Sequence, residues 1–86
     1  MQRVNIMEQP QSEHRTKDLA EASFLLTKRV KILRIEREGR TCWFVFRDKL
    51  LCEKLTSEFW FDNATVPAKQ FYDSVQTLKN RIFNNA

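Results

Sequence analysis

Residues 30–46, VKILRIEREGRTCWFVF, constrain the fold more than any other stretch, because they alone have the composition of β-strands. Two apolar-rich runs in this segment flank Gly39, the single glycine of the chain. Glycine adopts positive φ at no steric cost, so its position predicts the turn of a β-hairpin. The segments before and after the hairpin have the periodicity of helices. The predicted fold class is therefore α+β, with a two-stranded antiparallel ribbon.

The charges around Gly39 favour one register of this hairpin. A two-residue turn at Glu38 and Gly39 would set Arg37 opposite Arg40, a repulsive pair, and would force Glu38 to positive φ. A three-residue turn with Gly39 in the left-handed position avoids both costs and sets Glu36 opposite Arg40. The further pairs expected from this register are Arg34 with Cys42, Ile32 with Phe44, and Val30 with Phe46.

Both faces of the expected ribbon are largely apolar, which is unusual for an antiparallel sheet with one solvated side. One face carries Phe44 and Phe46. The opposite face is expected to hold Lys31, Leu33, Ile35, Thr41, Trp43 and Val45. Because an isolated hairpin is marginal in water, each face needs a cover. We expect helices on one face and a partner, with a second copy as a candidate, on or beside the other.

Three helices are predicted around the hairpin. The first follows an N-cap at Thr16 and runs to about Arg29, with apolar residues around nearly its whole circumference. Asp48 is expected to cap the second helix, residues 49–59. The third helix spans residues 67–83, and its apolar stripe consists of Ala68, Phe71, Val75, Leu78 and Ile82. The predicted order is helix, β-hairpin, helix, helix. The ribbon packs against three helices, and dimerisation would extend it.

Domain organisation follows from these elements. Residues 16–83 form a single α+β domain, and residues 84–86 form a frayed C-terminus. Residues 1–15 are polar and aperiodic, which predicts a flexible N-terminal arm with His14 solvated in it. A chain of 86 residues buries barely enough surface to fold alone, so dimerisation is a simple way to bury more.

Composition narrows the cellular context and the class of partner. The formal net charge of +4 and the isoelectric point of about 9.4 favour an acidic partner such as nucleic acid, although many small basic proteins bind none. No apolar run is long enough for a membrane span, and no secretory signal is visible. Cys42 and Cys52 are then expected to be reduced thiols in a cytoplasmic protein.

The inventory of reactive residues argues against an enzyme. His14 is the only imidazole, and its position on the expected arm leaves no assembled acid, base or activated nucleophile. A metal site built from His14, Cys42 and Cys52 lacks the paired spacing of zinc ligands. We expect no catalytic residue, no metal, no cofactor and no small-molecule substrate.

A basic hairpin is the leading candidate for function. Its positive side chains interleave with Trp43, Phe44 and Phe46, so the ribbon could contact phosphates through its charges and stack on bases through a ring. The predicted nucleic-acid-binding residues are Lys28, Arg29, Lys31, Arg34, Arg37, Arg40 and Arg47. The competing interpretation is that these charges protect strand edges while the aromatic residues form core. Glu36 and Glu38 also dilute the positive charge.

The alternative function is protein–protein interaction or homodimerisation. An apolar hairpin face around Trp43 would dock a partner or a second copy, because tryptophan is favoured at binding hot spots. The predicted partner-binding residues are Leu33, Ile35, Trp43 and Val45. Such a small protein could act as an adaptor or inhibitor encoded by a phage or mobile element.

Several short motifs resemble a family of small bacterial and phage proteins that is known only as a domain of unknown function. The motifs are TKDLAEASFLLTKR, then IER and GR before WFVF, then FW, then VPA with an aromatic residue three positions on. The resemblance covers residues 16–83 and implies a bacterial or mobile-element context, with no established activity or cofactor. Members often have glycine after the first helix, where this chain has Arg29.

Overall fold

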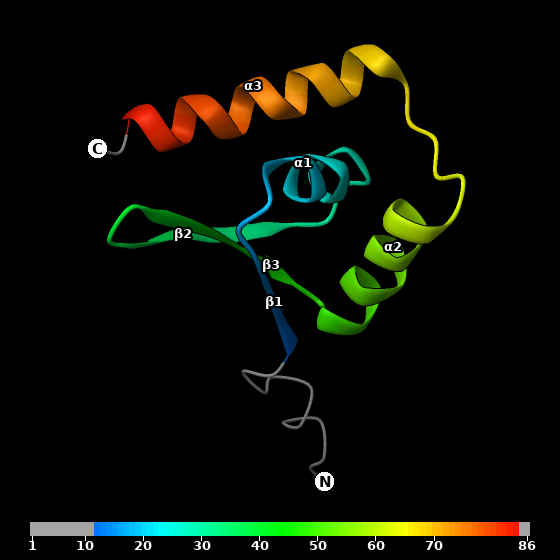
Figure 1. Ribbon diagram of the computed structural model, residues 1–86, viewed down its shortest axis with the longest axis horizontal. Helices are drawn as coiled ribbons and strands as arrows, with labels where there is room; N and C mark the ends of the chain where they lie inside the picture. Colours follow the sequence, from blue (N-terminus) through cyan, green and yellow to red (C-terminus); the bar gives the residue numbers. More distant parts are fainter. Residues whose placement is uncertain (1–11, 85–86) are drawn as a thin grey trace, which may run out of the picture.

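The computed structural model describes residues 12–84, which form three helices and a three-stranded antiparallel sheet (Figure 1). In chain order the elements are β1 (Glu13–Thr16), α1 (Leu19–Thr27), β2 (Ile32–Glu38), β3 (Thr41–Arg47), α2 (Lys49–Phe61) and α3 (Ala68–Asn84). The strand order is β1-β3-β2, so β3 is central and the other two strands are edges. The α+β class, the three helices and the hairpin are confirmed, but the sheet has one strand more than predicted.

The additional strand comes from the segment that was expected to be a flexible arm. Residues 13–15 belong to β1, which pairs antiparallel with β3 and sets His14 opposite Phe46. Sequence periodicity could not reveal β1, because a strand of four residues shows only two side chains on each face. Residues 1–11 of the expected arm, and residues 85–86 at the C-terminus, lie outside the described residues.

The predicted hairpin register is wrong. The turn consists of Gly39 and Arg40, because Glu38 pairs with Thr41. Gly39 has a φ of +61° and stands first of the two turn residues, which is the arrangement of a type II′ turn. A turn at Gly39 and Arg40 avoids the repulsion between Arg37 and Arg40, and it leaves Glu38 outside the positive-φ position. The observed pairs include Arg37 with Cys42, Glu36 with Trp43, Ile35 with Phe44, and Arg34 with Val45, and a bulge separates Ile32 from Arg34.

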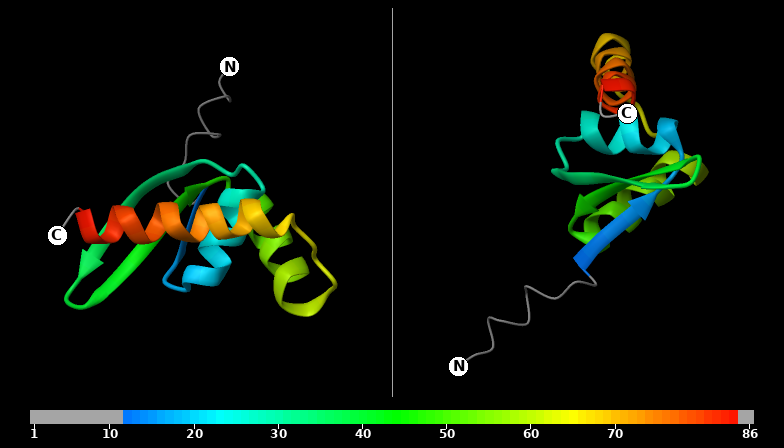
Figure 2. Two further views of the ribbon diagram at one scale, coloured as in Figure 1. Left: turned by 90° about the horizontal axis from the view of Figure 1, so that it is seen from above. Right: turned by 90° about the vertical axis from the view of Figure 1, so that its left-hand side faces the viewer.

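One face of the sheet, the inner face, is covered by helices. Figure 2 shows α1 lying between the sheet and α3, so α1 is buried on two sides. This position explains why its apolar residues run around the helix, with four consecutive residues of α1 buried from Ala22 to Leu25. The core cluster unites all three helices with the hairpin: Ala22, Leu25, Val30, Phe44, Phe46, Cys52 and Leu78.

The α1–α3 contact also contains hydroxyl groups that the predicted apolar stripe of α3 did not include. Thr27 Oγ1 lies 2.8 Å from Ser74 Oγ and 2.7 Å from the carbonyl oxygen of Ser23. These bonds satisfy Ser74, which is 9% exposed, inside an otherwise apolar contact. The stripe residues Leu78 and Ile82 pack against the core as predicted.

Both ends of α1 differ from the prediction in detail. Its N-cap is Asp18, whose Oδ1 accepts a hydrogen bond of 2.8 Å from Glu21 N, while Thr16 instead accepts one from Asp18 N. The helix ends at Thr27, and Arg29 follows with a φ of 68°. Two backbone bonds, from Arg29 N to Leu26 O and from Val30 N to Leu25 O, form a Schellman motif. Arginine therefore occupies the left-handed position where glycine is usual.

We predict that Arg29→Gly stabilises the fold by about 0.5–1 kcal/mol, because relief of the left-handed strain outweighs the added entropy of the unfolded chain. The matched control is Lys28→Gly, because Lys28 has a negative φ of −81° and gains nothing from glycine. Urea unfolding followed by far-UV circular dichroism would measure both. A loss of stability in Arg29→Gly would contradict the assigned motif.

Candidate functional site on the outer face of the sheet

The sheet face opposite the helices, which we call the outer face, holds the largest group of interacting charges. Residues that pair across antiparallel strands project to the same face, so the register assigns its members. They are Glu13 and Arg15 from β1, Arg34, Glu36 and Glu38 from β2, and Thr41, Trp43, Val45 and Arg47 from β3. Lys31 joins them, because Arg47 N donates to its carbonyl oxygen at 3.0 Å. Helices α1 and α3 lie on the other side of the sheet (Figure 2).

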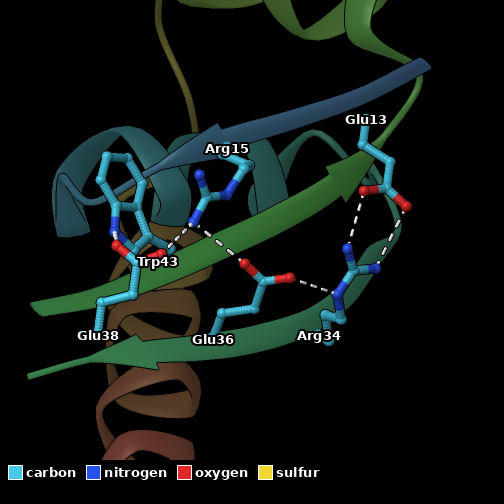
Figure 3. Close-up of polar contacts among 6 residues, drawn as sticks. All are labelled: Glu13, Arg15, Arg34, Glu36, Glu38 and Trp43. Carbon is cyan, nitrogen blue, oxygen red and sulfur yellow. Dashed lines mark hydrogen bonds and ion pairs between the residues drawn. The ribbon is translucent and has the colours of Figure 1, made fainter. Parts of the chain in front are cut away.

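Ion pairs link the two edge strands across the central strand (Figure 3). Arg34 forms a two-pronged contact with Glu13, at 2.9 and 3.2 Å, and its Nε donates to Glu36 at 2.7 Å. Arg15 Nη2 lies 3.1 Å from Glu36 and 3.4 Å from Glu38. The side chains therefore alternate in sign from Glu13 to Arg34, Glu36, Arg15 and Glu38.

Within the network, Arg34 and Glu36 favour each other's charged state. Hydrogen bonds to Glu13 and Glu36 raise the pKa of Arg34 above its usual value. The hydrogen bond from Arg34 lowers the pKa of Glu36, and the nearby charge of Arg15 acts in the same direction. The paired arginines thus already have anionic partners within the chain.

The same side chains cover the apolar residues of the outer face. Val45 is fully buried, and its cross-strand neighbours are Arg34 on one side and Arg15 on the other. The aliphatic stems of arginine cover apolar surface while their charged ends stay in water. The Arg15 guanidinium carbon also lies 4.5 Å from the centroid of the Trp43 ring, and Trp43 Nε1 donates to Glu38 at 3.1 Å. The Arg15 guanidinium therefore covers the Trp43 ring.

The four predicted partner-binding residues do not form one apolar patch. Ile35 lies opposite Phe44 and packs against the core on the inner face. Val45 is buried, and Leu33 lies at the β2 bulge. Trp43 alone of the four is a half-buried side chain on the outer face, and it is engaged by Arg15 and Glu38.

All seven predicted nucleic-acid-binding residues are exposed, but they differ in what they contact. Arg34 belongs to the ion-pair network, and the Arg37 guanidinium donates to the carbonyl oxygen of Ile82 near the C-terminus of α3. Within residues 12–84 the other five make no ion pair: Lys28, Arg29, Lys31, Arg40 and Arg47. Lys31 and Arg47 lie opposite each other, and Lys28 and Arg29 precede them in the α1–β2 connection.

Three charged residues of the outer face were missed by the sequence prediction: Glu13, Arg15 and Lys17. Lys17 Nζ lies 5.8 Å from the centroid of the Trp43 ring. The signal that could have found them is charge at every second residue, which is the period of a strand. The residue between the first two, His14, points to the inner side.

His14 is not the solvated residue that was expected. Its Nε2 lies 3.0 Å from Glu21 Oε2, and both side chains are mostly buried, at 15% and 13% exposed. The other Glu21 oxygen accepts a hydrogen bond of 2.8 Å from Trp60 Nε1. This polar cluster joins β1, α1 and α2, so it fixes the position of β1 against two helices.

The buried Cys52 thiol is held in its protonated form. Burial raises the pKa of the Cys52 thiol to about 11, assisted by the nearby charges of Asp48, Glu21 and Glu53, so this thiol stays protonated at neutral pH.

No cluster of three or more His, Cys, Asp or Glu residues suited to a metal occurs among the described residues. Nor does any described helix combine the length and apolar character needed to cross a membrane.

We predict that Glu36→Gln weakens the acid dependence of stability. The lowered pKa of Glu36 means that the unfolded state binds the proton more readily, so its contribution is present above pH 4.5, the ordinary value, and is lost as the pH falls through the lowered pKa. Glu36→Gln should therefore be less stable than the wild type at pH 7 and should lose less stability on acidification. Urea titrations at several pH values would measure this.

The control for this prediction is Glu58→Gln. Glu58 lies on α2 and makes no ion pair within residues 12–84. This variant should retain the acid dependence of the wild type. Equal acid dependence in the wild type and Glu36→Gln would contradict a contribution of the Glu36 ion pairs to folding.

Comparison with known proteins gives a family but no activity. No curated protein and no solved structure matches the chain. One family model matches residues 11–84 and so covers every helix and strand from β1 to α3. The resemblance to a family without an assigned activity is thereby confirmed. The chain belongs to the family described as a domain of unknown function, DUF5659.

Proposed function

We propose that this protein is a non-catalytic binding protein that associates with nucleic acid through exposed cations at the outer face and at the beginning of β2. The observation that carries the proposal is the juxtaposition of Lys31 and Arg47, which have no ion-pair partner within residues 12–84 and lie opposite each other. Lys28 and Arg29 add two exposed charges in the preceding connection. A cytoplasmic location, where Cys42 and Cys52 would stay reduced, is part of the proposal.

The proposed contact is with the phosphate backbone. Arg15 and Arg34 are engaged by carboxylates, so binding by these two would first break ion pairs with Glu13 or Glu36. The unpaired cations carry no such cost, and they can neutralise phosphates and release counterions. Trp43 is covered by Arg15, which favours phosphate contacts over base stacking. The proposed binding is consequently independent of base sequence and applies to DNA and RNA alike.

The variant Lys31→Ala with Arg47→Ala tests this function. Binding of a labelled oligonucleotide should weaken for every sequence, and the slope of log affinity against log salt should fall by about 2, one for each lost phosphate contact. Fluorescence anisotropy with duplex DNA, single-stranded DNA and RNA at about 50 to 200 mM salt would measure both effects.

The matched control removes the same amount of positive charge from a different part of the surface. Lys54→Ala with Lys79→Ala takes two exposed lysines from α2 and α3 and changes the net charge equally. It should retain the wild-type salt slope. Absence of binding by the wild type, or binding that does not depend on salt, would contradict the nucleic-acid proposal.

We also propose self-association as a second role, in place of the expected apolar patch around Trp43. The supporting observation is that β2 is a seven-residue edge strand with no partner on one side within residues 12–84. Edge strands present unpaired backbone groups that readily pair with another strand. Two copies joined at this edge would extend the sheet, as the sequence suggested for the ribbon.

Light scattering tests self-association. The mass of the wild type should rise from the 10.3 kDa of one chain toward about twice that value as the protein concentration increases. The measurement should be made at both low and high salt and without nucleic acid, so that no ligand can bridge two copies. A mass of one chain at every concentration would exclude the homodimer.

A further inference from the structure

The free edge of β2 presents a defined set of backbone groups. In an antiparallel pair, residues that exchange hydrogen bonds alternate with residues that do not. The two-residue turn makes Glu38 and Thr41 a bonded pair, so Glu36 and Arg34 also bond to β3. Ile35 and Arg37 are then the residues whose N–H and C=O groups point away from β3. They form the template for an added strand.

The order of charges along β2 suits a second copy of the same strand. The two outer-face residues that flank Ile35 have opposite signs, with Arg34 positive and Glu36 negative. If two β2 strands pair antiparallel about Ile35, each Arg34 lies opposite Glu36 of the second copy. Opposite charges in facing positions stabilise a strand pair, whereas like charges destabilise it.

Three other symmetric registers bring like charges together. Centring the pair on Arg34 sets two arginines face to face, and centring it on Glu36 sets two glutamates face to face. Centring on Arg37 again pairs arginines and also opposes Glu36 to Glu38. The register about Ile35 avoids all of these, and it sets Leu33 opposite Arg37 at the two ends of the contact.

We propose that β2 pairs antiparallel with β2 of a second copy in the register centred on Ile35, with reciprocal Arg34–Glu36 contacts. The inference rests on the self-association proposed above and names its surface and geometry. The two-fold axis runs perpendicular to the sheet, so the product is a six-stranded sheet with all helices on one side. Ile35 of each copy, which packs at the margin of the core, then meets Ile35 of the other.

The ion pairs of the single chain remain compatible with this contact. Arg34 keeps its two-pronged bond with Glu13, which lies on the far side of the sheet from the new strand. Edge charges usually oppose strand addition, but here Arg34 and Glu36 are complementary to the same two residues of a second copy. The pairing also joins the two outer faces on the same side of one sheet.

Substitution at Arg37 tests whether the β2 edge is the surface. Arg37→Pro removes an N–H that faces the free edge, and proline is tolerated at such edge positions. Arg37→Ala is the matched control, because it loses the same guanidinium contact with Ile82 but retains the N–H. By light scattering we expect loss of the dimer in Arg37→Pro and a retained dimer in Arg37→Ala. Circular dichroism would check that both fold.

Cysteine cross-linking tests the register. In a Cys42→Ser background, Ile35→Cys should form a disulfide dimer on mild oxidation, because facing residues lie within disulfide reach. Leu33→Cys mixed with Arg37→Cys should also cross-link, whereas each of these two alone should not. This mixture tests the register independently if Ile35→Cys proves too unstable to use. Cys52 stays buried and protonated, so it does not interfere.

The outcomes separate this inference from the proposal on which it rests. A wild type that is monomeric at all concentrations would overturn both. A wild-type dimer that survives in Arg37→Pro, or that gives no cross-link at Ile35 or between Leu33 and Arg37, would overturn the β2 register alone. Loss of that dimer in Trp43→Ala, with Arg37→Pro unaffected, would instead assign it to the outer face.

Discussion

The central strand must bury both of its faces, and the rest of the structure depends on this requirement. Phe44 and Phe46 point to the inner side and Val45 to the outer side, and all three are almost inaccessible to solvent. The helices bury the inner side, where each phenylalanine contributes about 1.5–3 kcal/mol by leaving water. On the outer side, the two edge strands supply Arg15 and Arg34, which flank Val45 and share Glu36 as an ion-pair partner. The two faces of β3 are thus buried in different ways, one by helices and the other by arginine side chains of the edge strands.

This arrangement explains why two arginines of the outer face are already engaged within the chain. Arg15 and Arg34 hold the edge strands together through Glu13 and Glu36, and Arg15 also covers the Trp43 ring. These contacts are exposed, so each contributes little by itself, but they share residues and form one network. Four of the cations that lack such partners within residues 12–84 lie at one end of the sheet: Lys28, Arg29, Lys31 and Arg47. The proposed nucleic-acid contact is accordingly local and not spread along the hairpin.

The two proposed roles use different parts of the same sheet. Phosphate contact involves side chains at the end of β3 and the beginning of β2, while self-association involves the backbone of the β2 edge. They are compatible, because pairing at the edge leaves Lys31 and Arg47 on the same face and repeats them across the two-fold axis. Joining two copies would double the number of unpaired cations on one side, which raises affinity for a polyanion through multivalency.

Local pattern in the sequence determined the helices, the hairpin and the apolar stripe of α3 that holds Leu78, because these depend on periodicity and on a single glycine. Asp48 was also correctly predicted as the N-cap of α2. Tertiary structure alone decided the role of β1, whose four residues are too few to show a period and are held by pairing with β3 and by the bond between His14 and Glu21. Tertiary structure also decided the position of the turn, because neighbouring hairpin registers differ in energy by only a few cross-strand side-chain interactions. The contacts of Arg34 depend on Glu13, which lies 21 positions away in the sequence. No local pattern could predict that these two side chains would form an ion pair.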